Sequence, residues 1–303
     1  MDIYLPIAGQ SVNALFIVAL GGLVGLLSGM FGVGGGFLTT PFLMFYGIPP
    51  TVAVASAATQ ITGASVSGAM AHTRRGGVDL KMGLVMIFGG LFGSLAGAGL
   101  FRFLQASGQI DLVIGTLYVL ILGSIGGLML KDALAALGYG PGLRTTAERP
   151  RHNRWVASLP LRWRFYASGL YISPLAPLAL GFVAGMLTLL LGIGGGFILV
   201  PAMIYLLGMP ARVVIGTSLV MILAVSAATT MIHALTTNAV DIVLAGLLLI
   251  GGVVGAQYGA MLTTRLKPDL LRLALAIIIL LVALRMFLGL TWRPDEIFSI
   301  ETL

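Results

Sequence analysis

The chain has 303 residues, of which 58% are hydrophobic and only 9% are charged. Soluble globular proteins carry about 25% charged residues, so this composition excludes a soluble protein and predicts an all-α integral membrane protein. The net charge of +7 does not indicate a nucleic-acid partner, because most basic residues lie in short segments between long apolar runs, as the positive-inside rule predicts. We therefore expect a lipid bilayer, and no nucleic acid, around this chain.

In chain order, the apolar runs predict two repeats, each with five helical segments. The first transmembrane repeat covers 1–131, a basic linker covers 132–172, and the second repeat covers 173–303. The expected segments are 12–31, 36–47, 51–71, 80–104 and 110–131 in the first repeat, and 174–191, 196–207, 212–235, 241–264 and 269–290 in the second. The second segment of each repeat is about 18 Å long, against a hydrocarbon core of about 30 Å. We expect it to dip and return, or to pair with the preceding segment as a hairpin of half-helices.

The evidence for a repeat is a glycine-rich motif that occurs twice. The segment 32–37 reads Gly-Val-Gly-Gly-Gly-Phe and 192–197 reads Gly-Ile-Gly-Gly-Gly-Phe, each followed by a proline, Pro41 or Pro201. Further matches follow in the same order: Gly47/Gly208, Pro49/Pro210, Ser56/Thr217, His72/His233 and Asp79/Asp241. Such ordered matches indicate an internal repeat.

The positions of the basic residues predict the orientation of the repeats. The linker contains Lys131 at its edge and several arginines between 144 and 164, so we assign it to the cytoplasm. With an odd number of crossings in each repeat, the two repeats have inverted topology and both termini lie outside. Inverted repeats are a recurring plan of transporters.

The triple glycines are the predicted centre of function. Three glycines in succession remove side chains from every face of a helix, so a helix breaks there. Broken backbone at membrane depth lines a wet cavity or is buried in protein. We predict that the N–H groups at 36–38 and 196–198 point at an anion; the alternative is a tight interhelical turn without a ligand. The candidate substrate-binding residues are Gly34, Gly35, Gly36, Phe37, Ser56, Thr59, Gln60, Gly194, Gly195, Gly196, Phe197, Thr217 and Ser218.

The other polar residues have simpler interpretations beside the functional ones. Serine and threonine in membrane helices often bond to their own backbone carbonyls, although a matched set beside the breaks favours a polar path. His72 and His233 are candidates for a proton or gating role; the alternative is that they are interfacial or capping residues. Asp79 and Asp241 suit helix N-caps. Glycines at four-residue spacing predict close helix packing.

What the chain lacks also restricts its function. It has no cysteine and we find no nucleophile with a base and no acidic pair in the apolar runs, so we expect no enzyme, no cofactor and no metal site. Intramembrane acids are what cation sites and proton relays usually need. A pathway of hydroxyls, amides and helix N-termini suits a small anionic substrate instead.

The repeated Gly-x-Gly-Gly-Gly-Phe followed by proline, the Gly-x-Pro at 47–49 and 208–210, and the following Ala/Ser/Thr-rich helix resemble the sulfite exporter TauE/SafE family of membrane permeases. The resemblance covers about 20–105 and 180–265. It implies a multi-pass transporter of the bacterial inner membrane for sulfite or organosulfonates. We expect a secondary exporter of such anions. The alternatives are proton-coupled uptake of a sulfonate or carboxylate, and a membrane scaffold that transports nothing; the oligomeric state is left open.

Overall fold

The computed structural model describes residues 2–31, 35–74, 76–136, 160–262 and 268–291. In the first repeat the helices are α1 (Ala14–Phe31), α2 (Gly36–Phe45), α3 (Pro50–Arg74), α4 (Leu80–Ala106) and α5 (Ile110–Ala136). In the second they are α7 (Leu175–Leu191), α8 (Gly196–Tyr205), α9 (Ala211–Thr236), α10 (Ile242–Leu262) and α11 (Pro268–Thr291). The ten segments expected from the sequence are therefore all helices, and the chain is an all-α integral membrane protein.

Five of the described helices are long and apolar enough to cross a membrane: α4, α5, α9, α10 and α11. Four others are apolar but shorter, namely α1, α2, α7 and α8. The two shortest, α2 and α8, follow the glycine motifs and each contains one internal proline, Pro41 or Pro201. In each repeat the glycine motif therefore separates the first helix from a short second helix, as the sequence predicts.

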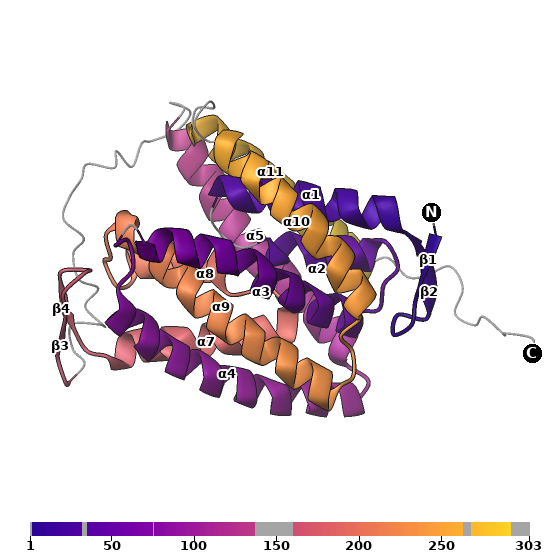
Figure 1. Ribbon diagram of the computed structural model, residues 1–303, viewed down its shortest axis with the longest axis horizontal. Coiled ribbons are helices and arrows are strands. Elements are labelled where there is room, and N and C mark those ends of the chain that lie inside the picture. Colours follow the sequence, from indigo (N-terminus) through magenta and orange to yellow (C-terminus); the bar gives the residue numbers. More distant parts are fainter. Residues whose placement is uncertain (1, 32–34, 75, 137–159, 263–267, 292–303) are drawn as a thin grey trace, which may run out of the picture.

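The longer helices α1, α3, α4 and α5 each pack mainly against a helix of the other repeat, whereas the short helices α2 and α8 pack mainly against α3 and α9 of their own repeats. Helix α1 packs on α10 and α4 packs on α7, while α3 packs on α9 and α5 on α11 (Figure 1). Thr59 lies beside Thr230 and Gly68 beside Leu219, so α3 and α9 run antiparallel. A two-fold relation between the repeats produces this exchange of partners.

Glycine stripes form the tightest helix contacts. Gly21 and Gly25 of α1 lie so close to α10 that a Cβ would overlap the backbone of Leu248 and Gly252. On the matched pair, Cβ atoms at Gly89 and Gly93 of α4 would overlap the backbone of α7 at Leu178 and Phe182. Small residues let helix backbones approach in lipid. The predicted packing role of these glycines is confirmed.

Two short antiparallel hairpins, which the sequence analysis did not anticipate, precede α1 and α7. Strands β1 (Asp2–Leu5) and β2 (Gln10–Asn13) form one, and β3 (Trp163–Phe165) and β4 (Leu170–Ile172) form the other, inside the predicted linker. They lie at opposite ends of the molecule (Figure 1). Each was missed because three or four residues with weak alternation give little signal.

Two buried aspartates hold the hairpins. Asp79 caps α4 by accepting from the Met82 N–H, and its other oxygen accepts from the N–H and the hydroxyl of Ser168. Asp241 accepts from the Leu244 N–H and, across the molecule, from the Ile7 N–H. The predicted capping role is confirmed, and each cap also fastens the hairpin of the other repeat.

Candidate functional site

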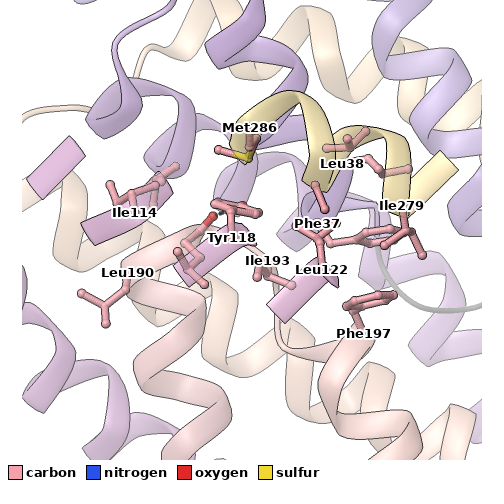
Figure 2. Packing of buried hydrophobic residues seen from close by; sticks show 14 of the residues in the cluster. Phe37, Leu38, Ile114, Tyr118, Leu122, Leu190, Ile193, Phe197, Ile279 and Met286 are labelled. Atoms are coloured by element: carbon pink, nitrogen blue, oxygen red, sulfur yellow. Dashed lines mark hydrogen bonds between the residues drawn. The ribbon is translucent and has the colours of Figure 1, made fainter. Parts of the chain in front are cut away.

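The two glycine breaks meet at the centre of the molecule. The rings of Phe37 and Phe197, which start α2 and α8, stack with centroids 4.5 Å apart and an interplanar angle of 8°. Figure 2 shows these two rings together with Ile193 and Tyr118 in one apolar cluster, to which α5 and α11 contribute. The fold thus brings together motifs that are far apart in the sequence.

In the second break, the chain turns through left-handed backbone. Gly192, Gly194 and Gly195 have φ of 65°, 74° and 71°, a region that costs other L-residues about 1–2 kcal/mol. A Cβ at Gly192 would lie 2.5 Å from the carbonyl oxygen of Val54. Glycine is therefore required here both by backbone conformation and by the close approach of α3.

A broken helix leaves carbonyl groups without partners, and two side chains satisfy those at the end of α7. The Tyr118 hydroxyl of α5 donates to the Leu191 carbonyl. His233 Nε2 of α9 lies 3.0 Å from the Leu189 carbonyl oxygen, an arrangement that requires the proton on Nε2. The ring of Phe101 packs edge-on against His233, with centroids 5.0 Å apart. His233 therefore caps the broken helix in this structure.

The backbone N–H groups at 193–197, after the end of α7, differ from these carbonyls, because no described residue accepts from them. Residues 193–197 are buried, and their backbone N–H groups have no hydrogen-bond acceptor within the described part of the chain. The next amide, that of Ile198, donates to the Gly195 carbonyl, as Leu38 donates to Gly35 in the first repeat. Ile198 and Leu38 are thus already bonded, so the expected set of anion-facing amides is shifted toward the glycines.

The first break contacts the second through α3. A Cβ at Gly36 would overlap both the Gly192 carbonyl oxygen and Ile61 Cδ1 of α3. At Gly194 a Cβ would lie 2.8 Å from Ile61 Cγ2. Gly35 has right-handed backbone, with φ of −67°. The side chain of Ile61 therefore fills the space between the two breaks.

Gln60 ties this region to two other helices. Its Oε1 lies 2.9 Å from the Thr39 hydroxyl of α2, and its Nε2 donates to the Leu248 carbonyl of α10 over 3.4 Å. Both ends of the amide are thus bonded to protein. Gln60 fixes the first turn of α2, a role that the sequence did not indicate.

The hydroxyl residues gather between α3 and α9. The oxygens of Thr62 and Ser226 lie 3.0 Å apart and those of Thr59 and Thr230 lie 3.4 Å apart. Three of these hydroxyls also reach a carbonyl of their own helix, in Thr59, Thr62 and Ser226. The expected bonding to backbone carbonyls is therefore confirmed for these three hydroxyls, and the polar path stays a prediction.

The remaining candidates differ in surroundings. Ser56 is fully buried, and its hydroxyl has no partner among the described residues. Its match Thr217 accepts from the Asp79 N–H, and Ser218 donates to the Ile215 carbonyl. His72 is only half-buried, and its side chain makes no hydrogen bond with another described residue. Gly34 lies outside the described residues, and Gly196 starts α8.

Sequence reasoning missed Thr39, Tyr118 and Ile61, which shape the site as much as the predicted residues. Thr39 is the third residue after the first triple glycine, so its closeness could have been read from the sequence. Tyr118 and Ile61 carry no such signal, because an apolar or aromatic residue in a membrane helix is usually a packing residue. Only the tertiary contacts identify them.

A comparison with known families now assigns the chain. The family model of the sulfite exporter TauE/SafE matches residues 17–286. The chain belongs to this family. Both glycine breaks lie within the matched range, as do all ten helices apart from the first turn of α1 and the last turns of α11. Membership makes the chain a multi-pass membrane transporter.

Individual relatives of this TauE/SafE protein agree with the family assignment. The chain is 30% identical to a "Probable membrane transporter protein" of Xylella fastidiosa strain Temecula1, over 91% of the chain and 95% of the relative. It is 27% identical to the Bacillus subtilis "Probable membrane transporter protein YunE", over 89% of the chain and 96% of the relative. No solved structure matches the chain.

Proposed function

We propose that this chain is a secondary transporter that exports small anions across a bacterial inner membrane, with sulfite and organosulfonates as the leading substrates. The observation that carries the proposal is the run of buried backbone N–H groups at 193–197 without acceptors among the described residues. A buried N–H without a partner costs free energy comparable to a lost hydrogen bond. A helix N-terminus with such groups is suited to an anion.

Buried hydroxyls of α2 and α3 also support an anion site. Thr40 is fully buried, and its Oγ1 lies 3.1 Å from where a Cβ at Gly192 would be. Ser56 is the second such hydroxyl. Hydroxyl and amide donors can replace the water around an oxyanion without a positive side chain, and sulfite and sulfonates present three oxygens to such donors.

Export follows from the charge of the substrate. Moving one negative charge out of an inside-negative cell releases about 2.3 kcal/mol per 100 mV. No carboxylate lies near the breaks in the described residues, where Asp79 and Asp241 cap helices instead. The potential alone therefore drives efflux in this proposal, with both termini outside and the 132–172 linker in the cytoplasm.

The engaged ring of His233 supports efflux without a proton carrier. Its Nε2 is bonded to the Leu189 carbonyl and its Nδ1 lies 3.3 Å from the Thr237 hydroxyl. Replacing His72 and His233 together by Gln should leave potential-driven efflux intact, because Gln retains an N–H donor. Loss of efflux at normal protein stability would favour proton-coupled uptake instead.

The deciding experiment is efflux from proteoliposomes loaded with sulfite, under an imposed potential. Gly195→Leu should abolish efflux, because a side chain there meets Ala184, Leu199 and Thr188 at 3.3 Å and fills the break. Wild-type efflux in Gly195→Leu would remove the anion site from this motif. Proteoliposomes of the wild-type chain that move none of sulfite, thiosulfate, sulfoacetate, taurine or carboxylates would favour the scaffold.

The matched control is Gly108→Leu, in the turn between α4 and α5. Gly108 has φ of 69°, close to the 71° of Gly195, but no atom lies within 4 Å of a Cβ there. Both variants therefore carry the same left-handed strain. We expect Gly108→Leu to transport normally; equal losses in both would mean that strain, not the break, causes the effect.

Orientation has its own test because the chain has no cysteine. A single cysteine at position 145 should react with a membrane-impermeant maleimide only after cells are opened. A cysteine at Gly9, in the β1–β2 turn, should react in intact cells. The reverse pattern would overturn the proposed topology.

A further inference from the structure

The two hairpins occupy matched positions but have opposite surface chemistry. Between residues 2 and 13 the only charged residue is Asp2. The β3–β4 hairpin carries Arg162 and Arg164, and Lys81 of α4 lies against it. The two-fold relation gives both hairpins the same framework, so the basic groups are an addition to one of them rather than part of the fold.

Lys81 is fixed against the hairpin without any acidic partner. Its Nζ donates to the Arg164 carbonyl over 3.3 Å and lies 5.2 Å from the centre of the Trp163 ring. No carboxylate in the described ranges lies within ion-pair distance of Lys81 or Arg164. The hairpin thus combines one cation fixed against it, Lys81, with a second one on strand β3, Arg164.

Large apolar side chains on the same hairpin are exposed. Tyr166 is 82% exposed, Leu161 68% and Trp163 46%. Leu161 has φ of 63°, a conformation that is costly for leucine. Exposed aromatic rings beside cations are unfavourable in water alone but are typical of the headgroup region of a bilayer, where one end of the ring is apolar and the other wet.

We propose that Lys81, Leu161, Trp163, Arg164 and Tyr166, the hairpin surface, bind the headgroup of an anionic phospholipid. The cations pair with the phosphate, while the rings and Leu161 contact the glycerol and upper acyl chains. A free phosphate ion would use only the cations and leave the apolar groups in water. The surface therefore fits a lipid, and its basic character matches the anionic cytoplasmic leaflet.

Asp79 attaches the hairpin surface to helix α4. It is 2% exposed, caps α4 beside Lys81, and holds Ser168 in the hairpin turn. The hairpin therefore keeps its position relative to α4 when a lipid binds. A bound lipid should stabilise the contact between α4 and the start of α7.

The test counts lipids retained by the purified full chain in native mass spectrometry, with dioleoylphosphatidylglycerol and dioleoylphosphatidylcholine as probes. Wild type should retain phosphatidylglycerol preferentially. Lys81→Gln with Arg164→Gln should weaken that binding about 30-fold, because about 1 kcal/mol per cation gives about 2 kcal/mol in total and each 1.4 kcal/mol is tenfold. Binding of phosphatidylcholine should be unchanged. Equal retention of both lipids by wild type would overturn the proposal.

Two further variants test whether lipid retention depends on the hairpin surface itself or on any exposed cation of the protein. Lys131→Gln removes an exposed cation from the end of α5, predicted on the same side of the membrane, and should retain phosphatidylglycerol like wild type. Tyr166→Ser cannot disturb the core, because its ring is exposed, yet should weaken retention of phosphatidylglycerol. Normal retention in Tyr166→Ser, loss in Lys131→Gln, or displacement of the lipid by inorganic phosphate would each contradict a lipid site here.

Discussion

The first and second glycine breaks have nearly the same sequence but are held in place by different chemistry. In the first, the Thr39 hydroxyl, the Gln60 amide and the Leu248 carbonyl form a polar chain. In the second, the corresponding positions are Leu199, Met221 and Met86, all members of one apolar cluster. The two polar side chains at the first break, Thr39 and Gln60, are thus replaced by the hydrophobic side chains of Leu199 and Met221 at the second.

The matched histidines His72 and His233 differ in the same way. His233 is 1% exposed and bonded to the end of α7, whereas His72 is half-buried and bonds to no described residue through its side chain. A duplicated fold with two equal halves could not favour one direction of opening. At the second break two carbonyl groups accept from Tyr118 and His233, whereas the described part of the first break is bonded through Gln60.

The largest expected effect tests how tightly the second break is packed. Gly192→Ala should lower the free energy of unfolding by about 2–5 kcal/mol, the sum of left-handed strain and overpacking against Val54. Chemical denaturation in mixed micelles measures it. The control is Gly9→Ala, because Gly9 has φ of 68° and no atom lies within 4 Å of a Cβ there. It measures the backbone strain alone and should cost about 1–2 kcal/mol. Equal stability losses in Gly9→Ala and Gly192→Ala would show that α3 does not press on the break.

The next effect concerns the caps on α7. Tyr118→Phe leaves the buried Leu191 carbonyl without its donor and should cost about 1–3 kcal/mol of stability. Tyr205→Phe, whose ring is 73% exposed, should cost nothing measurable. A stability of Tyr118→Phe equal to wild type would mean that the second break is not held by this hydrogen bond.

A double-mutant cycle tests the polar chain of the first break. Gln60→Met alone removes the hydrogen bonds that Gln60 makes to the Thr39 hydroxyl and to the Leu248 carbonyl, and should cost about 1–3 kcal/mol. Adding Thr39→Leu completes the apolar arrangement of the second break, so the double variant should recover part of the loss. If the stability losses of the two single variants simply add in the double variant, Thr39 and Gln60 are not coupled.

The smallest effect concerns Ile61, which separates the two breaks. Ile61→Val removes Cδ1, the atom against Gly36, and should cost about 0.5–1.5 kcal/mol while raising sulfite efflux from proteoliposomes. Ile222→Val, at the matched position in α9 and in the same cluster, should have the same stability cost without the gain in efflux. Equal efflux in both variants would remove Ile61 from the pathway.

Much of the fold could be predicted because the bilayer imposes long apolar runs, and glycine and proline mark where they end. All ten helices begin and end within a few residues of the expected positions. The site was only partly predictable. The repeat located both breaks, but nothing in the sequence shows that Gln60 is bonded at both ends or that Ile61 lies between the breaks. Such facts depend on which helix packs against which.

The hydrogen bond between the Ile7 N–H and Asp241 joins residues 234 positions apart, and this separation sets an order of assembly. A ribosome adds roughly 5–20 residues per second, so the first hairpin waits on the order of ten seconds to a minute for its partner. Helix α1 waits similarly for α10. The amino-terminal segment, although made first, is therefore among the last to be secured, and the translocation machinery or lipid must shield its glycine face meanwhile.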